Sequence, residues 1–138
     1  MRIRGIYINR GDARASLKTI NEGVDYLKQG FSLVIFPEGT RSQSSKLGEF
    51  KPGSFKLATK ARVPVVPVTL NGGYHTYEER GAVTKGCHID FMVHKPIETK
   101  DMSRSELAEL PHRVEEIIRG GLETLTAEAD KEENTDTE

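Results

Sequence analysis

The segment Phe36-Pro37-Glu38-Gly39-Thr40-Arg41-Ser42 gathers a carboxylate, a hydroxyl and a guanidinium within a few residues. The apolar run 31–36 that leads into it predicts a buried strand, and Pro37 ends that strand because it has no backbone N–H for a sheet ladder. Gly39 permits a backbone conformation that other residues avoid, which predicts a tight turn. In open α/β sheets ligands bind at the ends of strands, so this turn is a candidate ligand site.

The chemistry of the turn favours an anionic ligand. The guanidinium of Arg41 is a planar fork of donors that matches a phosphate oxygen pair. The simpler interpretation is a solvated ion pair between Glu38 and Arg41, which contributes little on a protein surface. The residue types alone leave both interpretations open.

The segment 36–42 resembles the third sequence block of the glycerolipid acyltransferases, a family that includes 1-acylglycerol-3-phosphate acyltransferases. Residues 5–10, which end in Arg10, resemble the second block, and the apolar stretch that contains Pro67 resembles the fourth. The resemblance extends from about residue 5 to residue 72. It implies a substrate phosphate site made of Arg10, Glu38, Gly39, Thr40, Arg41 and Lys51, with Pro67 on the side of the acyl donor.

The same resemblance implies transfer of a fatty acyl group from acyl-CoA or acyl carrier protein to the hydroxyl of a lysophosphatidic acid-like acceptor. In the family, a His followed five positions later by an Asp acts as general base, and no other cofactor takes part. No histidine here is followed by Asp at that distance: the residues at that position are Arg80 after His75, Val93 after His88, Thr99 after His94 and Ile117 after His112. We therefore expect no catalytic residue in this chain, which corresponds to the family domain without its N-terminal part.

Two functional hypotheses follow. In the first, the chain is the C-terminal portion of an acyltransferase domain and is inactive in isolation. In the second, it is a non-catalytic module that binds a phosphate or lysophospholipid. The membrane-bound substrate class predicts a peripheral location on the cytoplasmic face of the membrane.

Periodicity predicts an α/β fold. In chain order the predicted elements are a strand over 3–9, a helix over 12–29, a strand over 32–36, a short helix over 54–61, strands over 63–70 and 88–94, and a helix from residue 103. The alternation of helix and strand predicts an incomplete three-layer domain, with a mostly parallel central sheet flanked by helices. Pro111 is expected to kink or restart the last helix.

Lys51 lies just before the predicted helix over 54–61, where a helix N-terminus and a cation together favour an anion. The alternative is a lysine that only covers a turn. The resemblance favours the first interpretation, because the family carries a basic residue in this region.

Charge divides the chain unevenly. Six acidic residues and one basic residue give residues 128–138 a net charge of −5, which leaves +4 for the rest of a chain whose total is −1. We expect residues 1–127 to form the domain and residues 128–138 to be a disordered acidic tail. A mildly basic body suits an anionic lipid or a membrane surface, whereas scattered basic residues without aromatic platforms do not predict nucleic-acid binding.

A metal site is not predicted. The single cysteine, Cys87, excludes a Cys-rich metal site. His88, Asp90 and His94 share one face of the strand over 88–94, but a solvated polar face is commoner than a metal site with this spacing. No apolar run approaches the about 20 residues of a membrane helix.

Overall fold

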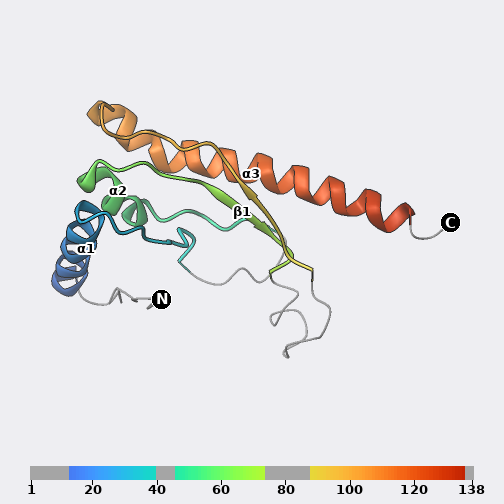
Figure 1. Ribbon diagram of the computed structural model, residues 1–138, viewed down its shortest axis with the longest axis horizontal. Helices are drawn as coiled ribbons and strands as arrows, with labels where there is room; N and C mark the ends of the chain where they lie inside the picture. The colour runs from blue at the N-terminus through green and yellow to red at the C-terminus, as the bar shows by residue number, and fades with distance from the viewer. Residues whose placement is uncertain (1–12, 40–45, 74–87, 136–138) are drawn as a thin grey trace.

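A computed structural model describes residues 13–39, 46–73 and 88–135 (Figure 1). Its elements, in order, are α1 (Ala13–Lys28), the 3-10 helix η1 (Pro52–Phe55), α2 (Lys56–Ala61), β1 (Val68–Asn71), β2 (Asp90–Val93) and α3 (Arg104–Thr135). Figure 1 shows α3 running along the length of the molecule beside β1, with α1 and α2 together at one end. The predicted strand over 3–9 lies outside the described residues and stays a prediction.

The helix predicted over residues 12–29 is confirmed as α1. Its C-terminus is closed by a Schellman motif, in which Gly30 N–H donates to Leu27 O at 3.0 Å and Phe31 N–H donates to Tyr26 O at 3.1 Å. Gly30 has a φ of 88°, which confirms its predicted role as the glycine after the helix. The rings of Tyr26 and Phe31 meet edge to face with centroids 5.9 Å apart, so an apolar contact accompanies the motif.

The prediction of a buried strand over residues 32–36 is wrong for the chain as described. Residues 31–36 have no regular secondary structure, and their side chains are largely open, with Val34 85% and Phe36 67% exposed. A strand is defined by the ladder that it shares with a neighbour, and no described segment pairs with this one. An apolar run therefore indicates a preference for burial but does not show that a partner strand is present.

The described residues form one sheet, and it is antiparallel. β1 and β2 pair in the register Val68↔Val93 to Asn71↔Asp90, and an isolated bridge between Val65 and Ile97 continues the pairing. These strands confirm the locations predicted over 63–70 and 88–94 with shorter bounds. The expectation of a mostly parallel central sheet is not met, because the only strands in the described part of the chain run in opposite directions.

The hydrophobic core lies between α3, the η1 region and the bridge beside β1. Five buried side chains form it: Phe50, Phe55, Ile97, Leu110 and Val114. The rings of Phe50 and Phe55 stack with their centroids 6.4 Å apart. The short helix predicted over 54–61 is confirmed as η1 followed by α2.

α3 begins with the predicted capping box. Ser103 N–H donates to Glu106 Oε2 at 2.7 Å, and Glu106 N–H donates to Ser103 Oγ at 3.3 Å. The helix continues through Pro111 without a break and ends at Thr135. The backbone of residues 128–135 is therefore helical where disorder was predicted, while the domain boundary at residue 127 stays a prediction.

One face of the two-stranded sheet rests on α3. Thr69 is 1% exposed, and its Oγ1 lies 2.8 Å from His94 Nε2 and 3.3 Å from Ile118 O of the helix. The side chains of the other face are open, although they are apolar: Val68, Leu70, Ile89, Phe91 and Val93 are each at least 41% exposed. The alternation predicted along residues 88–94 is confirmed, but it is the face of Asp90, Met92 and His94 that lies toward the helix.

Candidate functional site

The turn that follows residue 36 has the predicted backbone geometry. Gly39 N–H donates to Phe36 O at 3.1 Å, which closes a four-residue turn around Pro37 and Glu38. Gly39 has a φ of 74°, a conformation that a side chain disfavours. The prediction that Gly39 shapes this turn is confirmed. Its role at a phosphate stays a prediction.

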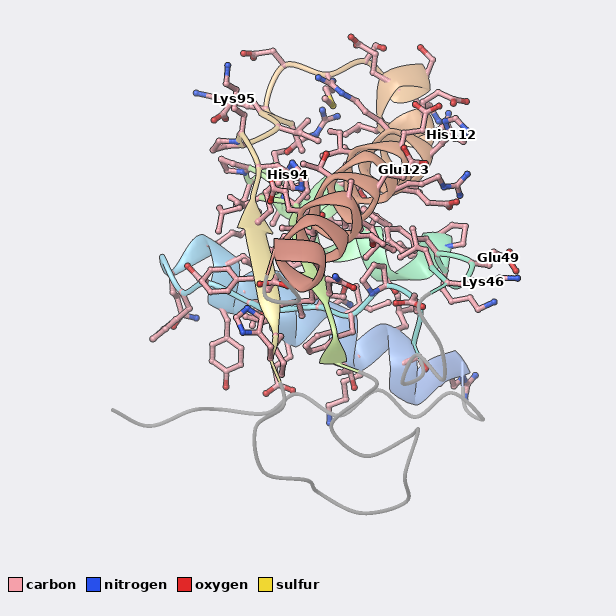
Figure 2. All side chains as sticks on the ribbon, turned by 90° about the vertical axis from the view of Figure 1, so that its right-hand side faces the viewer. Lys46, Glu49, His94, Lys95, His112 and Glu123 are labelled. Atoms are coloured by element: carbon pink, nitrogen blue, oxygen red, sulfur yellow. The ribbon has the colours of Figure 1, made fainter. Side chains whose placement is uncertain are left out.

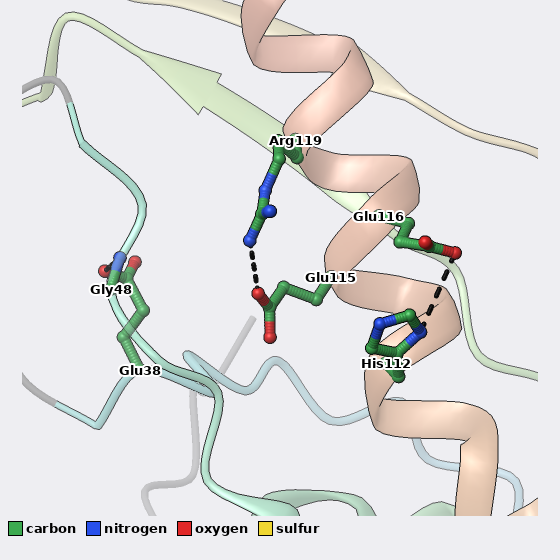
Figure 3. A network of polar contacts seen from close by, with 6 residues as sticks. All are labelled: Glu38, Gly48, His112, Glu115, Glu116 and Arg119. Atoms are coloured by element: carbon green, nitrogen blue, oxygen red, sulfur yellow. Dashed lines mark hydrogen bonds and ion pairs between the residues drawn. The ribbon is translucent and has the colours of Figure 1, made fainter.

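The carboxylate of Glu38 contacts the chain ten residues further on. Gly48 N–H donates to Glu38 Oε2 at 2.8 Å, in a partly buried position (Figure 3). The two residues flank a segment whose middle, residues 40–45, lies outside the described ranges. Sequence reasoning missed Gly48, because a glycine in a polar loop carries no signal that would name its partner.

Lys51 lies beside the turn through its backbone. Its N–H donates to Pro37 O at 2.9 Å, so residues 14 positions apart in the sequence are adjacent at the site. Its ammonium group lies 3.5 Å from Glu49 Oε2, with side-chain exposures of 58% and 82%. Such an exposed pair is weak and leaves the ammonium group accessible to a competing anion.

The helix predicted next to Lys51 is too short to hold an anion by itself. η1 has four residues and the α2 segment that follows it has six, so few peptide dipoles align at the start of the helix. Any attraction for a phosphate at this point therefore comes mainly from the lysine charge. The described part of the site thus combines Glu38, Gly39 and Lys51.

Pro67 is buried at the entry to β1. Its carbonyl accepts a hydrogen bond from His94 N–H at 3.0 Å. Its ring nitrogen carries no hydrogen and cannot donate a hydrogen bond to the neighbouring strand. The sequence predicts an edge, a bulge or a bend at this proline, and the structure places it where the regular ladder between β1 and β2 gives way to the single bridge at Val65. Its role on the side of an acyl donor stays a prediction.

Three predicted members of the phosphate site fall outside the described residues. Arg10, Thr40 and Arg41 lie within the ranges 1–12 and 40–45, so their relation to Glu38 and Lys51 stays a prediction.

The described side chains hold no metal site. Among the side chains that the structure describes, which end at residue 129, no group of three His, Cys, Asp or Glu comes together. His88 Nε2 lies 2.6 Å from Asp90 Oδ1 at the surface, whereas His94 is engaged with Thr69 beneath α3. Figure 2 shows His94 and Lys95 on the side of the molecule opposite to Lys46 and Glu49, which project outward.

Across the ranges that the structure covers, no helix combines the length and the apolar character needed to cross a bilayer. α3 carries polar side-chain pairs on its surface, among them Glu115–Arg119 and His112–Glu116 (Figure 3).

Comparison with known proteins gives a consistent result. Residues 1–71 match the family described as Acyltransferase, which is just over half of the chain. The 1-acyl-sn-glycerol-3-phosphate acyltransferase of Saccharomyces cerevisiae is 33% identical over 119 residues, which cover 83% of this chain and 39% of the yeast protein. The enzyme of the same name from Borreliella burgdorferi is 29% identical over 120 residues, which cover 87% of this chain and 48% of that protein.

The fold has a solved counterpart. The crystal structure of PlsC, the 1-acyl-sn-glycerophosphate acyltransferase of Thermotoga maritima, superposes with a TM-score of 0.71 at 37% identity, over 81% of this chain and 46% of PlsC. The chain thus spans less than half the length of each of these three relatives. The described arrangement of helices and a small antiparallel sheet belongs to a PlsC-like fold. On the match over residues 1–71 and this structural similarity, the chain belongs to the Acyltransferase family.

Proposed function

We propose that this chain forms the acceptor-binding portion of a 1-acylglycerol-3-phosphate acyltransferase. The reaction transfers a fatty acyl group from the thioester of acyl-CoA or acyl carrier protein to the free hydroxyl of a lysophosphatidic acid-like acceptor. A new ester C–O bond forms, the thioester C–S bond breaks, and the acceptor proton leaves through a general base.

The similarity to PlsC carries this proposal, because it combines sequence and fold. The match has a TM-score of 0.71 at 37% identity and covers 81% of the chain. The relatives from yeast and Borreliella share the name of the same acyl transfer. Each of them is more than twice as long as the matched part.

The phosphate of the acceptor is assigned to the basic residues around the turn. Arg41 and Arg10 supply guanidinium groups, and Lys51 supplies an exposed ammonium group that lies beside the exposed Glu49. Gly39 and Thr40 shape the turn that presents them. Pro67 lies on the side of the thioester donor in this proposal.

The general base is not assigned to any described histidine. His94 is occupied between Thr69 and α3, and His112 lies on the outer face of α3 beside Glu116. His88 pairs with Asp90 at the surface, two residues away rather than five. We therefore propose that residues 1–138 bind the acceptor without supplying the catalytic proton acceptor.

A second candidate is a non-catalytic phosphate or lysophospholipid binding module. The absence of a His–Asp pair with the family spacing from residues 1–138 favours this candidate, since a phosphate site can bind a ligand without catalysing a reaction. With a lysophospholipid as the ligand, both candidates act peripherally at a membrane surface, which we propose to be the cytoplasmic face.

Equilibrium dialysis of the purified chain tests the site that both candidates share. The probe is 1-acyl-sn-glycerol 3-phosphate below its critical micelle concentration, and the control is the monoacylglycerol with the same acyl chain. We expect binding of the control to be at least about tenfold weaker, because a charge-assisted contact contributes about 1.5–3 kcal/mol. Equal binding of the two lipids, or no binding of either, would overturn the proposal.

A further inference from the structure

Glu38 has the wrong chemistry for a direct phosphate ligand. An ionised carboxylate only accepts hydrogen bonds, and so does a fully ionised phosphate. The two groups also carry like charges, which repel more strongly where water is partly excluded. A role for Glu38 in a phosphate site must therefore be exerted through another group.

In the described part of the chain, the backbone of Gly48 is such a group. The 2.8 Å contact from Gly48 N–H to Glu38 Oε2 has the length of a charge-assisted hydrogen bond. A second bond, from Lys51 N–H to Pro37 O at 2.9 Å, lies next to it. Together they join the two ends of the segment 39–47, and of the two bonds only the first depends on a side chain.

Gly48 is specifically suited to this contact. A Cβ at position 48 would lie 2.6 Å from Glu38 Oε2 and 3.4 Å from its Cδ. Those atoms are the far end of a flexible side chain, so an alanine at position 48 would push the carboxylate away without forcing the backbone apart. By contrast, a Cβ at Gly53 would have no atom within 4 Å.

We propose that Glu38 is a positioning residue: its carboxylate ties the two ends of the segment 39–47 together by accepting the Gly48 N–H, and it does not touch the acceptor phosphate. The consequence for the acceptor rests on the proposed function, because the segment contains Arg41. The tie itself does not rest on that function.

Four variants of the full chain distinguish a Glu38 that positions the segment 39–47 from a Glu38 that binds the phosphate directly. Glu38→Ala removes both the acceptor atom and the charge, and Glu38→Gln removes the charge but keeps an acceptor oxygen. Gly48→Ala displaces the carboxylate but keeps its charge, and Gly53→Ala is the matched glycine control in an open position.

The first measurement is hydrogen exchange of the Lys51 amide, followed by NMR and corrected for intrinsic rates. We expect Glu38→Ala and Gly48→Ala each to lower its protection at least about tenfold, the range of a lost hydrogen bond to a charged group. Glu38→Gln and Gly53→Ala should stay within about threefold of the wild-type chain. Wild-type protection in Gly48→Ala, or equal losses in Glu38→Gln and Glu38→Ala, would overturn the proposal.

The second measurement is the dissociation constant for 1-acyl-sn-glycerol 3-phosphate. We expect Glu38→Ala and Gly48→Ala to bind about tenfold more weakly, and Glu38→Gln to bind at least as well as the wild-type chain because a like charge is gone. Weak binding by Glu38→Gln with unchanged binding by Gly48→Ala would show that Glu38 acts directly. If the wild-type chain does not bind the lipid, the proposed function fails, and the exchange measurement still decides whether Glu38 ties the segment.

Discussion

Gly121 of α3 touches Thr69 of β1 so closely that a Cβ on the glycine would lie 2.5 Å from Thr69 Oγ1. The same Cβ would lie 2.8 Å from two ring atoms of His94. Thr69 is almost completely buried, so its hydroxyl has little room to move away from an added methyl group. The helix therefore meets the sheet through a glycine and a hydrogen-bonded pair of polar side chains.

Two neighbouring glycines of α3 should respond oppositely to alanine. We expect Gly121→Ala to lower the free energy of unfolding by about 1–3 kcal/mol, since the methyl group overfills a packed contact. A Cβ at Gly120 would meet open space, and Gly120→Ala should raise the free energy of unfolding by up to about 1 kcal/mol through helix propensity. Urea unfolding followed by circular dichroism measures both, and changes of the same sign and size would contradict the close approach.

The hydrogen bonds of the Thr69 hydroxyl should contribute to stability in addition to the packing of its branched side chain. Thr69→Val keeps the branched side chain but removes the partner of His94 Nε2 and Ile118 O, so we expect a loss of about 1–3 kcal/mol. Thr126→Val is the control, because the hydroxyl of Thr126 bonds Leu122 O on an exposed turn of the same helix. If both variants unfold at the same urea concentration as the wild-type chain, the buried hydrogen bonds contribute nothing measurable.

Short-range features of this fold could be predicted from the sequence, because a few adjacent residues determine them. The capping box of Ser103 and Glu106 and the turn after α1 at Gly30 each follow from residue types at fixed spacing. The turn at Gly39 belongs to the same class. In each of these cases the interacting groups lie within five positions of one another.

Contacts between distant segments could not be predicted in the same way. The apolar run 31–36 indicates burial but does not specify a neighbour, and in the described chain it remains exposed. Alternation along β2 identifies two faces but not which one meets α3. In the candidate site, the carboxylate of Glu38 accepts a hydrogen bond from the backbone N–H of Gly48. Nearly every residue has such a donor, so the residue types do not indicate which one the carboxylate contacts.

The capping box gives the stability of α3 a defined pH dependence. Hydrogen bonds from the Ser103 hydroxyl and the Ser103 N–H lower the pKa of Glu106 below its ordinary value of 4.5. A carboxyl whose pKa is lower in the folded chain stabilises the fold above the unfolded pKa, and this contribution is lost as the pH falls through the folded pKa.

We therefore expect Glu106→Gln to be less stable than the wild-type chain at neutral pH, and the difference to shrink as the pH drops below 4.5. Glutamine still suits the capping position, so the helix itself should persist. Glu109→Gln, an exposed glutamate on the next turn, is the control. Thermal unfolding at several pH values measures the difference, and a gap that is constant or widens on acidification would contradict the assignment.

Arg41 and Lys46 provide a comparison of two cations in one segment. If Arg41 binds the acceptor phosphate, Arg41→Ala should weaken binding of 1-acyl-sn-glycerol 3-phosphate by about 2 kcal/mol or more, which is about 30-fold in the dissociation constant. Lys46 is exposed, and Lys46→Ala should change the dissociation constant by no more than about threefold. Equal effects of the two substitutions would show that the segment attracts the lipid by net charge alone.

We expect the isolated chain not to catalyse acyl transfer. None of its four histidines is followed five positions later by aspartate, so the acceptor hydroxyl has no base in the arrangement that the family uses. We expect residues 1–138 at micromolar concentration to release no thiol above background from acyl-CoA and 1-acyl-sn-glycerol 3-phosphate, while PlsC from Thermotoga maritima, assayed in parallel, does. Thiol release that depends on the lysophospholipid would mean that another group accepts the proton. His88→Ala would then be the first variant to assay, because its ring nitrogen already lies 2.6 Å from a carboxylate oxygen of Asp90.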